Sequence, residues 1–146
     1  MDITVRTAEN SDIPALCELE AQCFSLPWSE KSFEDFFKNG CSVCLVAEND
    51  GKVLGYVGMN LILGEGEITN LAVSKDHRRK GIGEALINAL CRWDGLCRLL
   101  LDVRLSNTAA QNLYKKCGFF EDGIRRGFYS KPREDAVLMS REIKQD

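Results

Sequence analysis

The stretch between residues 67 and 93 constrains the fold more than any other part of the chain. It reads as an apolar run EITNLAV, a loop SKDHRRKGIG and a helical apolar pattern that begins at Ile82. The basic side chains of the loop are Lys75, Arg78, Arg79 and Lys80. A strand, a glycine-rich loop and a helix N-terminus together form an anion site, because free N–H groups and the helix dipole face the ligand. The stretch therefore predicts a domain of strands and helices with a phosphate-bearing ligand at this loop.

Three classes of phosphate ligand compete for such a loop. A nucleoside-triphosphate loop needs Gly-Lys-Ser/Thr, but Gly83 is followed by Glu84. A dinucleotide site needs a small residue where Leu86 stands, and it follows the first strand of a fold rather than a later one. The pyrophosphate of coenzyme A is the third class, and it conflicts with neither observation.

Alternating or continuous apolar runs predict seven strands. They cover residues 3–8, 42–48, 53–63, 67–73 and 98–104, and the segments GFFEDGIR (118–125) and EDAVLMSREI (134–143). The turn NDGK between the second and third runs predicts a hairpin. We expect an α/β (α+β) fold with a mixed, mostly antiparallel sheet of about seven strands.

Four helices are expected between these strands. Ser11 caps the first, with Pro14 in its first turn, and Ser29 caps the second, a short helix rich in phenylalanine. The third covers residues 82–93, with Trp93 on its apolar face. Ser106 caps the fourth, which Gly118 ends.

Composition adds limits on the class of protein. A chain of 146 residues with 45% apolar and 28% charged residues fits one globular domain, residues 1–146. No apolar run resembles a secretory signal or a membrane span, so we expect a cytoplasmic protein. The seven cysteines offer one Cys-x-x-Cys and no second pair, so reduced thiols and no metal are expected.

The order of these elements and several motifs resemble the Gcn5-related N-acetyltransferase family. RRKGIG (78–83) matches its Gln/Arg-x-x-Gly-x-Gly/Ala signature, with NLAV (70–73) just upstream. The segments FSLPWSEKSF (24–33), LDVRLSNTAAQNLYKKCGF (101–119) and REDAVLM (133–139) resemble the branch that acetylates the N-terminal alanine of a small-subunit ribosomal protein. The resemblance spans about residues 3–143.

The resemblance implies acetyl-CoA as co-substrate, in a cleft where the fourth and fifth strands splay apart. Backbone groups of Leu71, Ala72 and Val73 would follow the pantetheine. The loop residues Arg78, Arg79, Lys80, Gly81, Ile82 and Gly83 would wrap the pyrophosphate, and Asn107 would also contact the cofactor. Tyr114 matches the acid that protonates the leaving thiolate. The base is Asp102, which replaces a glutamate of that branch, or Glu67, where other members place a base.

On the acceptor side, the resemblance assigns Trp28 and Tyr129 to the walls of the substrate site. Residues 1–74 contain 4 Lys and Arg against 12 Asp and Glu, which suits a cationic partner such as the N-terminus of a basic ribosomal protein. An α-amine has a pKa near 7.7–8.0, against about 10.4 for lysine, so it needs a weaker base. This difference favours N-terminal over lysine acetylation.

Other functions compatible with the sequence are acetylation of a protein lysine, a polyamine or an antibiotic amine, and a non-catalytic acyl-CoA-binding module. Loss of the acid and of nearby carboxylates would indicate such a module, and neither is lost here. A net charge of −3 argues against nucleic-acid binding. No membrane contact is expected, and a monomer is the default oligomeric state.

Overall fold

A computed structural model describes residues 2–144 of the chain. Its seven strands are β1 (Thr4–Thr7), β2 (Ser42–Asn49), β3 (Lys52–Ile62), β4 (Glu65–Val73), β5 (Arg98–Arg104), β6 (Phe120–Ser130) and β7 (Arg133–Glu142). Its α-helices are α1 (Ile13–Cys23), α2 (Glu30–Lys38), α3 (Ile82–Cys91) and α4 (Thr108–Lys116), with short 3-10 turns at Asn10–Asp12 and Lys75–His77. The predicted order of strands and helices is confirmed.

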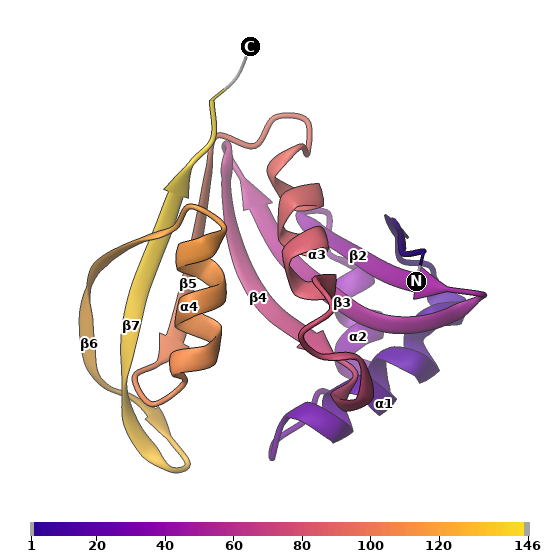
Figure 1. The fold of residues 1–146 in the computed structure, drawn as a ribbon, viewed down its shortest axis with the longest axis horizontal. Coiled ribbons are helices and arrows are strands. Elements are labelled where there is room, and N and C mark those ends of the chain that lie inside the picture. The colour runs from indigo at the N-terminus through magenta and orange to yellow at the C-terminus, as the bar shows by residue number, and fades with distance from the viewer. Residues whose placement is uncertain (1, 145–146) are drawn as a thin grey trace.

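The strands form one sheet in the order β1-β2-β3-β4-β5-β7-β6 (Figure 1). Every neighbouring pair is antiparallel except β4 and β5, which run parallel. These two strands pair over three residues only, from Glu65 opposite Arg98 to Glu67 opposite Leu100. Beyond that point they diverge, as Figure 1 shows. The predicted mixed sheet with splayed fourth and fifth strands is confirmed.

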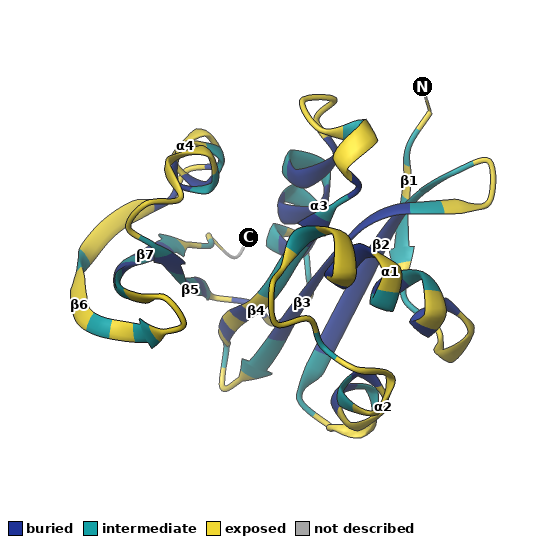
Figure 2. Ribbon diagram, turned by 90° about the horizontal axis from the view of Figure 1, so that it is seen from below, coloured by how far each residue is buried: buried dark blue, intermediate teal, exposed yellow. Residues whose placement is uncertain are grey.

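Helices cover both faces of the sheet and close two separate cores. Leu45 and Ala47 of β2 face the core under α3 and α4, whereas Cys44 and Val46 face the core under α1 and α2. This alternation is the period of two that a strand imposes on its side chains. In Figure 2 the buried residues concentrate along β2 and β3, whereas β6 at the sheet edge is mostly exposed.

Three predicted helix boundaries are wrong. Ser11 lies inside the 3-10 turn that precedes α1, so Asp12 is the residue before the first helical position. The cap of α4 is Asn107, whose side chain accepts a hydrogen bond from Ala110 N at 3.1 Å. Ser106 instead donates its backbone N–H to Glu134 of β7 at 2.6 Å. A capping box between Glu9 and Asp12 sets the turn before α1, whereas the error at α4 follows from a tertiary contact that local capping rules do not include.

The third misplaced boundary is the end of α3, at Cys91. Trp93 lies beyond it and donates its backbone N–H to Leu90 O at 2.9 Å, in a tight closing turn. Its ring still packs against the core, so the predicted apolar contact holds although the helix does not reach it. Ser29 as the cap of α2 and Gly118 after α4, with φ of 90°, are as predicted.

Candidate active site

The loop between β4 and α3 presents backbone groups in the way an anion site requires. Gly81 precedes the helix with φ of 79°, and nothing lies within 4 Å of a Cβ placed there. The first helical hydrogen bond runs from Ala85 N to Gly81 O at 3.0 Å, so the amides of residues 82–84 have no helical partner. Arg79 has φ of 62°, so the loop backbone bends sharply just before the helix. This geometry suits the predicted pyrophosphate contact.

Basic side chains surround this loop without entering ion pairs. Arg78, Arg79 and Lys80 make no salt bridge to a residue in the described range, 2–144. Arg78 does contact the thiol of Cys23, with Nη2 3.4 Å from Sγ. The three side chains therefore remain available to a phosphate group.

The end of β4 offers unpaired backbone groups where β5 has turned away. Ser74 N donates to Leu54 O of β3 at 2.8 Å, whereas Val73 O accepts from the Cys23 thiol at 3.4 Å on the other side. Because successive residues of a strand direct their backbone groups to opposite edges, Leu71 shares the open side with Val73. Ala72 is buried and faces β3 with its backbone. The Leu71 amide is therefore free to donate to a ligand lying between the strands.

A cleft of about 520 Å³ occupies the space between the diverging strands. It is lined by Glu20, Cys23, Phe24, Ser25, Leu26, Trp28, Ile68, Thr69, Asn70, Leu71, Leu101, Asp102, Val103, Arg104, Asn107, Ala110, Tyr114, Tyr129 and Lys131. Of the predicted catalytic residues, Asp102 and Tyr114 lie in this wall, and so do the predicted substrate residues Trp28 and Tyr129. Glu67 is exposed and is absent from the lining, one residue before β4 reaches it.

Tyr114 is almost fully buried on α4, with 7% of its surface exposed, and its ring packs against Phe119. Burial, with smaller contributions from Cys117 and Tyr129, raises the pKa of its phenol above the ordinary 10. Its hydroxyl bonds to no residue in the range 2–144. A phenol of this kind stays protonated at neutral pH and can act as a proton donor.

Asp102 is half-buried on β5 and makes no hydrogen bond or ion pair within the described part of the chain. Arg104, two residues further along β5, pairs with Glu134 at 3.2 Å and not with Asp102. Tyr129 lies close enough for Asp102 to contribute, after burial, to raising the pKa of that phenol. Asp102 is therefore an unengaged carboxylate facing the cleft.

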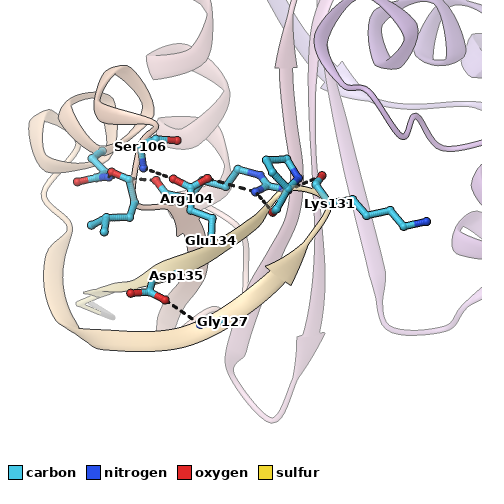
Figure 3. A network of polar contacts seen from close by, with 9 residues as sticks. Arg104, Ser106, Gly127, Lys131, Glu134 and Asp135 are labelled. Atoms are coloured by element: carbon cyan, nitrogen blue, oxygen red, sulfur yellow. Dashed lines mark hydrogen bonds and ion pairs between the residues drawn. The ribbon is translucent and has the colours of Figure 1, made fainter.

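The β6–β7 hairpin that carries Tyr129 is held by a polar network around Arg104 (Figure 3). The Arg104 guanidinium donates to Pro132 O at 3.0 Å and to Lys131 O at 3.2 Å, besides its pair with Glu134. It also stacks over the Tyr129 ring, 4.2 Å from the ring centroid. Arg104 thus joins the strand of Asp102 to the aromatic wall of the cleft.

The same network continues into the start of α4 and along the hairpin. The second carboxylate oxygen of Glu134 accepts the backbone N–H of Ser106, and Asp135 accepts that of Gly127 at 2.8 Å (Figure 3). Asn107, beside Ser106, uses its side-chain oxygen for the helix cap. Its NH₂ group bonds to no residue between 2 and 144, so that group remains available for the predicted cofactor contact.

The opposite wall is the loop of residues 24–28 between α1 and α2. Trp28 packs against Phe33 and Phe36, with ring centroids 5.2 and 5.4 Å away. Its backbone N–H donates to Glu20 of α1 at 2.8 Å. Trp28 therefore both packs against α2, as an ordinary core residue would, and borders the cleft.

Sequence reasoning missed Glu20 and Arg104. Glu20 occupies a position on α1 that the apolar stripe of Leu16 and Cys23 would give to an apolar residue, which was a signal for a buried charge. Arg104 carried no such signal, because its partners lie about 30 residues further along the chain. No three His, Cys, Asp or Glu side chains come together as a metal site within residues 2–144. None of the described helices is long and apolar enough to cross a membrane.

Comparison with known proteins identifies the family that has these features. Residues 13–119 match the model of the Acetyltransferase (GNAT) family. The chain belongs to this family. It is therefore an N-acetyltransferase, and the expected family and fold are confirmed.

Relatives define the branch to which the chain is most usefully compared. The chain is 35% identical over 145 residues to the [ribosomal protein bS18]-alanine N-acetyltransferase of Escherichia coli K12, and the match covers 96% of this chain and 97% of that one. The crystal structure of the E. coli ribosomal-protein-S18-alanine N-acetyltransferase superposes with a TM-score of 0.90 at 33% identity, covering 99% and 96% of the two chains. Arabidopsis thaliana NAA60 in complex with acetyl-CoA, 22% identical, shares the fold with a TM-score of 0.87 over 97% and 99% of the chains.

Proposed function

We propose that this acetyltransferase transfers the acetyl group of acetyl-CoA to the N-terminal α-amine of a ribosomal protein that begins with alanine. The observation that carries the proposal is the cleft between β4 and β5. It brings the buried phenol of Tyr114, the unengaged carboxylate of Asp102 and the open edge of β4 together around one cleft. Similarity to a bS18-alanine N-acetyltransferase over nearly the whole of both chains supports the choice of acceptor.

Bound acetyl-CoA would supply an activated acetyl group, and the residues of the chain would hold it in place. The free amides of residues 82–84, with Arg78 and Arg79 beside them, suit a pyrophosphate. The open amide of Leu71 suits the acetyl carbonyl, whose oxygen gains negative charge as the amine attacks. Asn107 would add a side-chain N–H donor. Together these groups form the proposed donor side of the site, and Leu71 and Asn107 among them line the cleft.

Three proton and charge movements complete the reaction. Asp102 accepts a proton from the substrate ammonium, directly or through a water; the neutral amine then attacks the acetyl carbonyl, and Leu71 N–H stabilises the oxyanion that forms. Tyr114 donates its phenolic proton to the departing thiolate. Glu67 is the less favoured base, because its exposed side chain lies outside the lining of the cleft. The proposed reaction needs no metal.

The acceptor would enter between Trp28 and Tyr129. Because ribosomal proteins are made in the cytoplasm, the proposed function places the enzyme there. It acts on a protein N-terminus, so it requires contact with neither nucleic acid nor membrane, and a monomer suffices.

A peptide panel tests the proposal. We expect a peptide with a free N-terminal alanine followed by basic residues to be acetylated on its α-amine, as read by mass spectrometry of fragments. The same peptide with a blocked N-terminus and a free lysine should react far more slowly, because a lysine amine is almost fully protonated at pH 7. Equal labelling of lysine, or preferential labelling of spermidine or of an aminoglycoside, would replace this acceptor with one of those amines.

A further inference from the structure

Glu20 is a buried carboxylate in the wall of the cleft that the proposed chemistry does not use. Only 1% of its surface is exposed. One oxygen accepts the backbone N–H of Trp28 at 2.8 Å, and the other accepts the phenol of Tyr56 at 2.5 Å and the side-chain amide of Asn70 at 3.2 Å. Glu20 therefore connects α1 to the acceptor loop, to β3 and to β4.

No cation accompanies this charge. Within residues 2–144, no Lys or Arg nitrogen lies within 4 Å of the Glu20 carboxylate. All three of its donors are neutral groups. Burying a carboxylate without a counter-charge is costly, and an apolar residue would fill this position of α1 at lower cost. Stability therefore does not explain a glutamate at this position, and the three groups that bind it indicate another role.

The partner on β4 gives the cluster its link to the reaction. A carboxylate only accepts hydrogen bonds, so the NH₂ group of Asn70 must face Glu20 and the orientation of that amide is fixed. The Asn70 oxygen is buried and has no partner among the described residues, so Glu20 alone orients this side chain. Asn70 directly precedes Leu71, whose amide faces the proposed acetyl site.

We propose that Glu20 is a positioning residue that ties the acceptor loop, residues 24–28, to β4 beside the acetyl site. This inference rests on the proposed function, which places the acceptor amine beside the acceptor loop and the acetyl carbonyl beside β4, the two elements that Glu20 connects. An amine attacks from about 3–3.5 Å, and a misplacement of about 1 Å costs roughly 10²-fold in rate. A rigid link to β4 keeps that spacing, since the only other hydrogen bond of residues 24–28 within the described part of the chain runs from Phe24 N to Glu20 O at the start of the loop.

The test compares Glu20→Gln with Glu18→Gln, which removes the same charge from an exposed position of the same helix. Glutamine keeps one acceptor oxygen and places an NH₂ group against Trp28 N or against Tyr56 and Asn70, so the three present bonds cannot all be kept as they are. Both variants are made in a Trp93→Phe background, where Trp28 is the one remaining tryptophan of the two. Acrylamide quenching of Trp28 fluorescence then reports the order of the acceptor loop.

We expect Glu20→Gln to increase the quenching of Trp28 and to raise the KM for the alanine peptide by about tenfold, the scale of one lost bond to a charged group. The KM for acetyl-CoA should change little, because Glu20 reaches β4 only through the side chain of Asn70, whereas the groups assigned to acetyl-CoA on that strand are backbone amides. Glu18→Gln should change none of the three. Tyr56→Phe, which removes one donor and keeps the ring, should shift quenching and peptide KM in the same direction by less.

Two results would overturn the proposal. In the first, quenching and peptide KM of Glu20→Gln match those of Glu18→Gln. In the second, the KM values for both substrates rise together with a fall in Tm, in Glu20→Gln and Tyr56→Phe alike, which would show a structural role only. Failure of the proposed function is seen separately, as absence of peptide acetylation by the parent protein, and the quenching measurement does not depend on it.

Discussion

On the proposed donor side of the site, along β4 and residues 78–84, the groups assigned to acetyl-CoA are mainly backbone amides. On the acceptor side, at the loop of residues 24–28 and the β6–β7 hairpin, side chains form the walls, and two charged residues hold them. Glu20 binds Trp28 N, and Arg104 binds the hairpin backbone and stacks on Tyr129. Backbone donors depend on chain geometry, whereas the acceptor walls depend on a few long side chains.

The difference explains which half of the site can vary. A site built from amides tolerates substitution of its side chains, provided that its glycines remain. A site held by Glu20 and Arg104 changes shape when either residue or its partner changes. One cofactor site can therefore serve many acceptors, because specificity depends on separate and replaceable contacts. The following predictions address the two sides and the residues between them.

The largest effect is expected at Tyr114, which stands between the two sides. Tyr114→Phe keeps the packed ring and removes only the proton donor. We expect kcat to fall by about 10²–10⁴-fold, with little change in KM for either substrate. Steady-state kinetics with the alanine peptide measures both. A change in the KM for acetyl-CoA that matches the change in kcat would mean that the phenol binds the cofactor instead.

The pH dependence of kcat is a further test of Tyr114 as the acid. Burial raises the pKa of Tyr114, so its donor form persists below that raised value and is lost only above it. Deprotonation of Tyr114 should therefore cause no loss of kcat between about pH 7 and pH 9. A fall of kcat in that window that disappears in Tyr114→Phe would contradict the role of a buried acid.

Asp102→Asn should give the next largest effect. It keeps the size of the side chain and removes the proton acceptor, so we expect kcat to fall by about 10²-fold or more. Glu67→Gln is the matched control on the neighbouring strand and should be nearly neutral, because its exposed side chain lies outside the cleft lining. A large loss in Glu67→Gln with a mild one in Asp102→Asn would assign the base to the other carboxylate.

The donor side is tested by Gly81→Val. Gly81 has φ of 79°, which a β-branched residue resists, so the loop should distort just where its amides converge. We expect the KM for acetyl-CoA to rise by at least about tenfold, with the peptide KM unchanged. Gly51→Val is the control, because Gly51 has φ of 78° and equally open surroundings in the β2–β3 turn.

The two glycine variants should lose similar stability, measured as Tm, and only Gly81→Val should lose affinity for acetyl-CoA. Calorimetric titration with acetyl-CoA or with CoA separates the two effects. If Gly81→Val binds as tightly as the parent protein, the ligand is held by side chains instead. The basic loop residues would then be the next to substitute, beginning with Arg79→Ala.

The donor and acceptor sides also differ in how well they could be predicted from the sequence. The seven strands follow local rules of periodicity and were predicted correctly, and so was the start of α3 at Ile82 after the glycine-rich loop. Ser106 was wrongly predicted as the cap of α4, because Glu134 of a distant strand binds its N–H. Glu20 was missed for a related reason, since its three partners are 8, 36 and 50 residues away. Local patterns predict the donor side, whereas long-range polar contacts build the acceptor side.

The smallest effect in this series is expected at Arg104, where the comparison between the two sides is sharpest. Arg104→Met keeps a long side chain and removes the bonds to Lys131, Pro132 and Glu134 together with the contact over the Tyr129 ring. The hairpin should loosen at its tip, and we expect the peptide KM to rise by about tenfold. The KM for acetyl-CoA should change by less than about twofold, because the Arg104 side chain makes no contact with the amides assigned to acetyl-CoA, and its backbone bond to Asn107 is kept in the variant.

Two companion variants make this result specific to the hairpin. Arg98→Met removes an arginine of the same strand that pairs with Glu65 and Glu142 away from the cleft, and it should leave both KM values unchanged. Arg104→Lys keeps the charge but not the planar fork or the stacked ring contact, so it should recover only part of the loss. Full recovery by lysine would mean that charge alone matters at this position. An equal rise in both KM values would mean that Arg104 supports the whole cleft, and the division between backbone-built and side-chain-built sides would then fail.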